Sequence, residues 1–248
     1  MTVTIPQADS GIEYLNADVN GYRAHYLKAG TGPPVVLLHG GASDSRDWLE
    51  TMAALADRHT LYAPDLIGFG QNERNSDGYY LTEFSEFIVN LMDRLELPAA
   101  SLIGHSFGGR ICLDIALEHP ERVRKLVLAD SAGMGKVSRF GTIVLTGFWV
   151  VRKLFRLRQP YPTFLAREDD DPDWACTERL PELKMPTLLV WKRHDLYLPL
   201  SIARKAAALI PNARLTVIPG MGHAPHGRTA RVFIERVREF LDEGEEGS

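Results

Sequence analysis

The feature that most constrains this chain is the pentapeptide at residues 104–108, Gly-His-Ser-Phe-Gly, which has the form G-x-S-x-G. An apolar run ending at Ile103 precedes it and a helical pattern follows it, so the chain must turn sharply from a strand into a helix at Ser106. Such a turn holds the serine in a strained conformation with its oxygen exposed above a sheet edge, and the glycines leave room for the neighbouring backbone. The pattern therefore predicts a nucleophilic serine; an incidental serine in a glycine-rich turn would not explain the rest of the chain.

Short apolar runs alternate with helical patterns along most of the chain. We expect buried strands at 35–38, 61–63, 101–103, 125–129, 187–191 and 215–218, and helices near 48–58, 82–95, 107–118, 200–208 and 228–241. This alternation implies crossover connections and a mostly parallel sheet. Residues 12–29 instead predict a hairpin around Asn20-Gly21, which would form an antiparallel edge. The expected fold class is α/β, with a mostly parallel eight-stranded sheet flanked by helices.

Residues 136–182 break the alternation, because they exceed an ordinary connection between a helix and a strand. Residues 140–157 are strongly apolar, and basic residues gather at their end: Arg152, Lys153, Arg156 and Arg158. We interpret 136–182 as a short helical cap inserted after the sixth strand, on a core domain formed by 1–135 and 183–248. The alternatives are a surface excursion without a role and a helix that lies on a membrane surface.

Composition narrows the classes of function. The chain has 248 residues, a formal net charge of −4 and 45% hydrophobic residues, which fits one large globular domain without a nucleic-acid surface. Cys112 and Cys176 do not make a disulfide framework, and the first residues lack the pattern of a signal peptide. We therefore expect a cytoplasmic protein that binds neither nucleic acid nor membrane. The acidic run at 168–171 is interpreted as a solvated loop, so no metal site is expected, and monomer and homodimer both remain open.

A serine hydroxyl becomes a nucleophile when a base lies within hydrogen-bond distance. His223 follows the last expected strand, in Pro-Gly-Met-Gly-His, and so belongs to the same sheet edge as Ser106. It is the predicted base, and His226 is its nearest competitor. His105 neighbours the serine but is expected to point away across the turn.

The base in turn needs a carboxylate that orients it. Asp195 comes after the strand at 187–191 and precedes His223 by one strand–helix–strand unit, which favours it as this acid. Asp130, which ends the strand at 125–129, is the alternative. Asp65 lies in a glycine-rich turn and is interpreted as structural.

The reaction also needs donors for a developing oxyanion, and backbone N–H groups are the usual solution. Phe107 opens a helix, so its N–H lacks an intrahelical acceptor and lies at the positive end of the helix dipole. The loop after the strand at 35–38 reads His-Gly-Gly-Ala, and its glycines let backbone approach a substrate. We predict Gly41 as the second donor, with Ala42 as the alternative.

These motifs resemble those of the α/β-hydrolase fold family, of the compact esterase, lactonase and C–C hydrolase type. The resemblance covers nearly the whole chain except 136–182, and the motifs that carry it are His39–Gly41, Pro64–Gly70, Gly104–Gly109, Trp191–Asp195 and Gly220–His226. The order serine, aspartate, histidine fits the family. The resemblance implies a cofactor-free hydrolase with nucleophile, acid and base at Ser106, Asp195 and His223, and with Gly41 and Phe107 as oxyanion donors. Lys192 departs from the pattern, because relatives usually carry glycine there.

The expected activity is hydrolysis of a small carboxylic ester or lactone through an acyl-enzyme. Phe148, Trp149 and Phe155 of the apolar cap are the predicted substrate-binding residues, and they favour an apolar substrate. The first alternative is cleavage of carbon–carbon bonds in ring-cleavage products, although such relatives often carry asparagine where this chain has His105. A more distant alternative is a ligand sensor with the same fold.

Overall fold

The computed structural model describes residues 11–156, 161–167, 170–171, 174–225 and 227–244. Its main sheet has eight strands in the order β1-β2-β4-β3-β6-β7-β9-β10. Their bounds are Glu13–Val19 (β1), Tyr22–Ala29 (β2), Pro34–Leu38 (β3), Thr60–Pro64 (β4), Ala100–His105 (β6), Val123–Ala129 (β7), Thr187–His194 (β9) and Ala213–Met221 (β10). The strands from β4 to β10 pair in parallel, and β1 and β2 form the antiparallel edge that the hairpin dipeptide predicts. The predicted fold class is confirmed.

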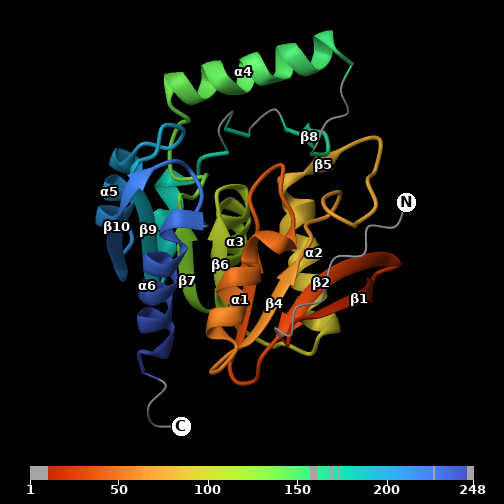
Figure 1. Ribbon diagram of the computed structural model, residues 1–248, viewed down its shortest axis with the longest axis vertical. Helices are drawn as coiled ribbons and strands as arrows, with labels where there is room; N and C mark the ends of the chain where they lie inside the picture. Colours follow the sequence, from red (N-terminus) through yellow and green to blue (C-terminus); the bar gives the residue numbers. More distant parts are fainter. Residues whose placement is uncertain (1–10, 157–160, 168–169, 172–173, 226, 245–248) are drawn as a thin grey trace.

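Helices cover both faces of this sheet (Figure 1). The helices α2 (Leu81–Arg94), α3 (Phe107–Glu118) and α5 (Leu200–Leu209) bury their apolar residues in one core cluster. On the other face α1 (Leu49–Leu55) and α6 (Ala230–Asp242) form a second cluster, in which Trp48 packs near Phe233 with 6.2 Å between ring centroids. Because the parallel strands are covered on both faces, their sequences are apolar without alternation.

The glycine-rich turn after β4 is built around the buried carboxylate of Asp65. This carboxylate accepts the backbone N–H of Ser45 at 2.8 Å and that of Gln71 at 2.8 Å, and it lies 3.1 Å from Nδ1 of His25. A Cβ on Gly70 would lie 2.2 Å from Asp65 Oδ2, so only glycine fits beside the carboxylate. Burial alone would raise the pKa of Asp65, but these hydrogen bonds outweigh it and hold the pKa at about 2. The structure agrees with the structural interpretation of this residue.

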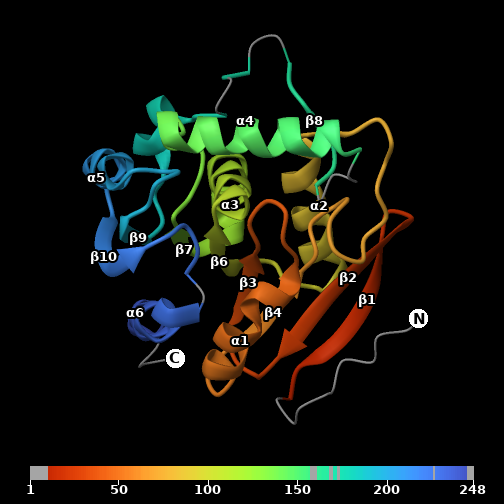
Figure 2. The same cartoon turned by 45° about the horizontal axis from the view of Figure 1, so that its top comes forward.

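Between β7 and β9 the chain leaves the sheet and forms α4 (Arg139–Leu154). This helix lies across the end of the sheet above α3 (Figures 1 and 2), as a cap requires. It ends at Leu154, three residues before the end of the apolar run at 140–157. A short parallel pair joins β5 (Tyr79–Tyr80), just before α2, to β8 (Phe164–Leu165) of the inserted segment. The sequence analysis did not foresee this pair. The division into core and cap stays a prediction.

We predict that Asp65→Asn destabilises the fold. The amide keeps one acceptor oxygen, but its NH₂ group would face a backbone N–H, so the free energy of unfolding at pH 7 should fall by about 2 kcal/mol. Because the pKa of Asp65 is depressed, its contribution is complete above the ordinary value of 3.8 and is lost as the pH falls toward about 2. Urea unfolding at pH 7 measures the loss, with the exposed Asp77→Asn as control. Equal stability of the Asp65 and Asp77 variants would contradict the prediction.

Candidate active site

Ser106 sits at the turn between β6 and α3 with φ 50° and ψ −113°, a left-handed conformation that is rare for a residue with a side chain. Its N–H donates to the carbonyl of Ala129 at 3.0 Å, and its own carbonyl accepts the N–H of Ala132 at 3.0 Å, so the end of β7 and the loop after it fix the turn. A Cβ on Gly108 would lie 2.3 Å from the carbonyl oxygen of Leu38. The strained turn that the pentapeptide predicts is therefore present, and close packing holds it.

The predicted nucleophile, base and acid lie in one hydrogen-bonded line. Nε2 of His223 is 2.8 Å from Oγ of Ser106, and Nδ1 of His223 is 2.7 Å from Oδ2 of Asp195. A carboxylate can only accept hydrogen bonds, so Nδ1 carries the proton and Nε2 faces the hydroxyl as an acceptor. In this arrangement Ser106 can pass its proton to His223 when it attacks an electrophile. His226, the competing base, lies outside the described residues.

Of the two candidate acids, Asp195 contacts the imidazole. Its second oxygen, Oδ1, accepts the backbone N–H groups of Tyr197 at 2.7 Å and Leu198 at 2.9 Å, which fixes the carboxylate. Asp130 lies nearby, and its Oδ1 accepts the N–H of Lys192 at 2.8 Å. The choice of Asp195 over Asp130 thus agrees with the geometry.

His105 has a role that the sequence analysis missed. Its Nε2 donates to the carbonyl oxygen of His223 at 2.5 Å, and the two imidazole rings lie 5.3 Å apart. The side chain of His105 is therefore directed toward the loop that carries His223, and it holds the backbone of that loop. On the other side the ring of Tyr197 packs 5.3 Å from His223. Only the position next to Ser106 could have signalled the contact, since the partner is a carbonyl 118 residues away.

The loop after β3 lies against the turn at Ser106. A Cβ on Gly40 would come 3.5 Å from Cβ of Ser106, and one on Gly41 would come 3.9 Å from Cβ of Phe107. His39 supports this loop from below: its Nδ1 donates to the carbonyl of Gly40 at 2.8 Å, and its Nε2 accepts the N–H of Leu66 at 3.0 Å. Complete burial lowers the pKa of His39, which favours the neutral ring that this pattern needs.

Gly41 and Ala42 are both exposed, and Ala42 has φ 62°. The backbone of this loop is therefore open to solvent next to the start of α3, where Phe107 has the first N–H of the helix. The choice between Gly41 and Ala42 as oxyanion donor stays a prediction.

Two of the predicted substrate-binding residues of the cap are exposed to solvent. Phe148 is 46% exposed and Phe155 is 66% exposed, while the side chain of Trp149 lies outside the described part. The aromatic rings that surround the start of α3 come from elsewhere. The ring of Phe107 packs against those of Phe84 (5.0 Å), Phe164 (5.1 Å) and Trp174 (5.7 Å).

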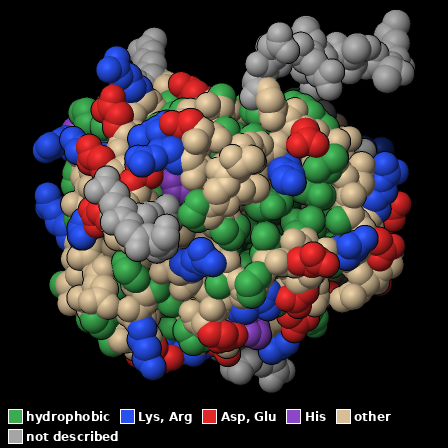
Figure 3. Space-filling model, turned by 90° about the horizontal axis from the view of Figure 1, so that it is seen from below, with side chains coloured by type: hydrophobic (Ala, Val, Ile, Leu, Met, Phe, Trp, Pro, Cys, Tyr) green, Lys and Arg blue, Asp and Glu red, His purple; other side chains and the backbone are tan. Residues whose placement is uncertain are grey.

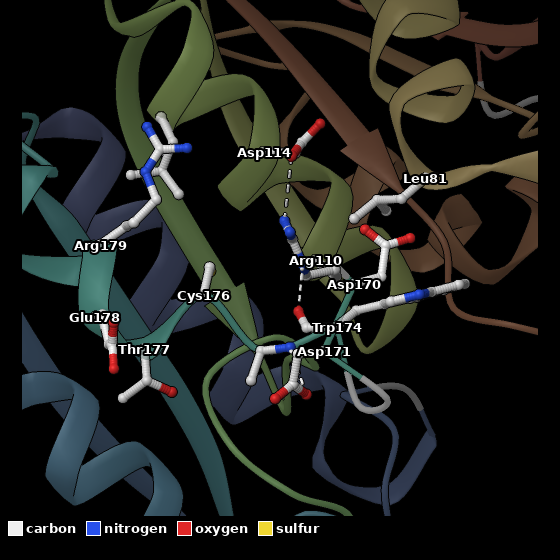
Figure 4. Close-up of a pocket in the computed structure, with 12 residues that line it drawn as sticks. Leu81, Arg110, Asp114, Asp170, Asp171, Trp174, Cys176, Thr177, Glu178 and Arg179 are labelled. Carbon is white, nitrogen blue, oxygen red and sulfur yellow. Dashed lines mark hydrogen bonds and ion pairs between the residues drawn. The ribbon is translucent and has the colours of Figure 1, made fainter. Parts of the chain in front are cut away.

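A cavity of about 700 Å³ lies beside this aromatic cluster, lined by residues of α2, of α3 and of the stretches 170–171 and 174–179 (Figure 4). Arg110, one helical turn after Ser106, donates through Nε to the carbonyl of Trp174 at 2.7 Å and lies 3.5 Å from Asp114. Trp174 lines the cavity and also packs against Phe107, so its indole contacts both the cavity and the residue that follows Ser106. Ser106 and His223 are not among the described residues that line the cavity.

The fold and this constellation define a hydrolase of the α/β class with a serine at its nucleophile turn. The sequence model for the alpha/beta hydrolase fold matches residues 33–157, and the chain belongs to this family. It is 30% identical to a 2-hydroxymuconate semialdehyde hydrolase from Pseudomonas sp. strain CF600, over 91% of this chain and 92% of the relative.

Two solved structures are similar in fold. A carboxylesterase from Bacillus subtilis superposes with a TM-score of 0.80 and 22% identity, over 94% of this chain and 92% of that protein. A meta-cleavage product hydrolase from Pseudomonas fluorescens IP01 superposes with a TM-score of 0.78 and 24% identity, over 92% and 97% of the two chains. The neighbours thus include hydrolases of ester bonds and of ring-cleavage products.

The carboxyl of Asp130 has a raised pKa. Burial raises the pKa of Asp130 to about 7, the charge of Asp195 adds to this, and the hydrogen bond from Lys192 opposes it. Because the folded pKa exceeds the ordinary value of 3.8, the folded protein retains a proton that the unfolded chain releases. The carboxyl therefore reduces stability progressively as the pH rises from about 4 through 7.

We predict that Asp130→Asn stabilises the protein at pH 8 but not at pH 4. The amide oxygen still accepts the N–H of Lys192, and the cost of burying a charge disappears. The free energy of unfolding should exceed that of the wild type by on the order of 1–3 kcal/mol at pH 8, as urea titrations at both pH values would show. An Asp130→Asn variant whose free energy of unfolding falls further below that of the wild type as the pH rises would contradict the prediction.

Proposed function

We propose that this protein is a serine hydrolase of carboxylic esters or lactones that works through an acyl-enzyme. The observation that carries the proposal is the continuous line from Ser106 through His223 to Asp195, with 2.8 Å and 2.7 Å between the bonded atoms. Membership of the α/β-hydrolase family and the similarity to a carboxylesterase fold support it.

In the proposed reaction, Oγ of Ser106 attacks the ester carbonyl while Nε2 of His223 takes its proton. Asp195 stabilises the imidazolium through the hydrogen bond at Nδ1. The oxyanion is held by the N–H of Phe107 and that of Gly41, each worth about 2–4 kcal/mol in the transition state. His223 then protonates the leaving alcohol, and it activates a water molecule that releases the acid and restores Ser106.

An apolar acyl or alcohol group fits the surroundings of the serine. The rings of Phe84, Phe164 and Trp174 pack around Phe107, which follows the nucleophile directly. Phe148 of α4 and Phe155, which follows the helix, are exposed, and we keep them as proposed contacts for the substrate. Such walls favour a neutral substrate over a charged one.

Cleavage of a carbon–carbon bond in a ring-cleavage product is the second candidate, and one observation favours it. The relative that is 30% identical over nine-tenths of the chain is a 2-hydroxymuconate semialdehyde hydrolase. Muconate derivatives are carboxylates, which need a cationic partner in the site. Arg110 is the cation nearest in sequence to Ser106, and it is already bonded to Trp174 and Asp114. Because Arg110 already has these partners, we favour ester hydrolysis over cleavage of a carbon–carbon bond.

We predict that p-nitrophenyl esters are hydrolysed with a maximum at one acyl length between acetate and decanoate. Ser106→Ala should lower kcat/KM by at least about 1,000-fold, since the remaining groups cannot form an acyl-enzyme. The exposed Ser201→Ala serves as the matched control, and circular dichroism shows that both variants are folded. Activity that persists in Ser106→Ala would exclude this serine as the nucleophile.

The two candidate reactions separate in a parallel assay. We expect the wild type to turn over the best ester at least about tenfold faster, as kcat/KM, than a dienone carboxylate of the ring-cleavage type, because the charged end loses solvation beside aromatic walls. Loss of dienone absorbance measures the second reaction. Faster dienone turnover that also vanishes in Ser106→Ala would assign the carbon–carbon reaction and overturn the ester assignment.

A further inference from the structure

The helix α4 presents a band of large apolar side chains to solvent. The residues are spaced at three or seven positions, apart from the adjacent pair at 150 and 151, and their exposed fractions are high: Phe140 52%, Ile143 69%, Val150 48%, Val151 49% and Leu154 73%. In an α-helix this spacing places side chains on one side. A band of this length on a soluble helix is unusual, because exposed apolar residues are ordinarily scattered singly.

Two glycines of the helix show which side faces the body of the protein. A Cβ on Gly141 would meet Val137 at 2.8 Å and the backbone of Tyr197 at 3.2 Å, whereas a Cβ on Gly147 would meet nothing within 4 Å. Gly147 lies within the apolar band, between Ile143 and Val150. The band therefore faces outward, away from the sheet, as the position of α4 in Figures 1 and 2 allows.

Charge is distributed unevenly around this band. Residues 136–167 include seven Lys and Arg and no Asp or Glu, although the whole chain has a formal net charge of −4. Within the described part, Lys153 and Arg156 are exposed at the end of α4. The opposite end of the molecule, shown in Figure 3, carries acidic and basic side chains interspersed. The apolar band is thus set in a basic stretch, which the acidic run at residues 168–171 follows directly.

We infer that the outer face of α4 docks on an anionic lipid surface. An apolar band flanked by Lys and Arg is the pattern of a helix that lies in the membrane interface, where the side chains enter the acyl boundary and the cations contact lipid phosphates. Among the described helices, none has the length and apolarity of a membrane span. A second copy of α4 fits less well, since pairing two such faces brings like charges together.

The proposed contact turns the Ser106 edge of the sheet toward the lipid, because α4 lies over that edge. Substrates dissolved in the membrane would then reach the site without crossing bulk water. Lipid binding itself does not rest on the proposed hydrolysis, so the two can fail separately.

The test is flotation of the full-length protein with vesicles of phosphatidylglycerol and phosphatidylcholine, against vesicles of phosphatidylcholine alone. We expect the wild type to bind the anionic vesicles at least about tenfold more tightly in 50 mM salt, and to lose most of this preference in 0.5 M salt. Ser106→Ala should bind like the wild type, which separates this result from the outcome of the ester assay.

Two double variants address the two parts of the contact. Ile143→Asn with Leu154→Asn removes apolar area from the band. Lys153→Glu with Arg156→Glu reverses two charges, and each reversal should lower the affinity for anionic vesicles by about fivefold or more. Matched controls lie on other surfaces: Tyr14→Asn with Leu209→Asn, both about 40% exposed, and Arg231→Glu with Arg236→Glu on α6. The α4 variants should lose at least tenfold in affinity, and the controls should keep the wild-type value.

Equal binding of the wild type to both vesicle types would overturn the inference, and so would equal losses in the α4 and control variants. Light scattering measures the molar mass of the protein and so tests the alternative that a second copy of the chain binds the band. A wild-type dimer that Ile143→Asn with Leu154→Asn converts to a monomer, without vesicle binding by the wild type, would assign the band to a second copy of the chain.

Discussion

The site depends on the absence of side chains at two positions, Gly104 and Gly108, two residues before and after Ser106. Gly108 packs against the carbonyl of Leu38, and a Cβ on Gly104 would lie 2.5 Å from the carbonyl of Gly108. Because these glycines let β3, β6 and α3 meet, the serine is driven into a left-handed conformation at the end of the strand. The strain is tolerated because hydrogen bonds to the end of β7 and to the loop after it fix the turn.

The parallel sheet supplies the rest of the site. The strands β3, β6, β7, β9 and β10 end at one edge, and each is followed by a polar residue with a defined position: His39, Ser106, Asp130, Asp195 and His223. Residues separated by more than a hundred positions thereby meet without a dedicated scaffold. The two aspartates then diverge through their surroundings. Asp195 takes two backbone N–H groups and the imidazole, whereas Asp130 has one backbone donor and a raised pKa.

The sheet, its helices and the three hydrogen-bonded residues could be predicted from the sequence, because periodicity and turn residues determine them locally. The contact of His105 with His223 could not, since its acceptor is a backbone carbonyl that no side-chain pattern reveals. The aromatic cluster was missed for a related reason: Phe164 and Trp174 lie in the inserted segment, where no regular period indicates a partner. Phe148 and Phe155 are apolar and exposed, and their role as substrate contacts stays a prediction.

The start of the inserted segment contacts the loop after β9, which carries Asp195. Ser138, which caps α4, donates its N–H to the carbonyl of Tyr197 at 2.8 Å and its hydroxyl to that of Leu196. The N–H of the same Tyr197 donates to Asp195, and its ring packs on His223. The start of α4 and the carboxylate of Asp195 are therefore held by the same loop, while the outer face of the helix remains exposed.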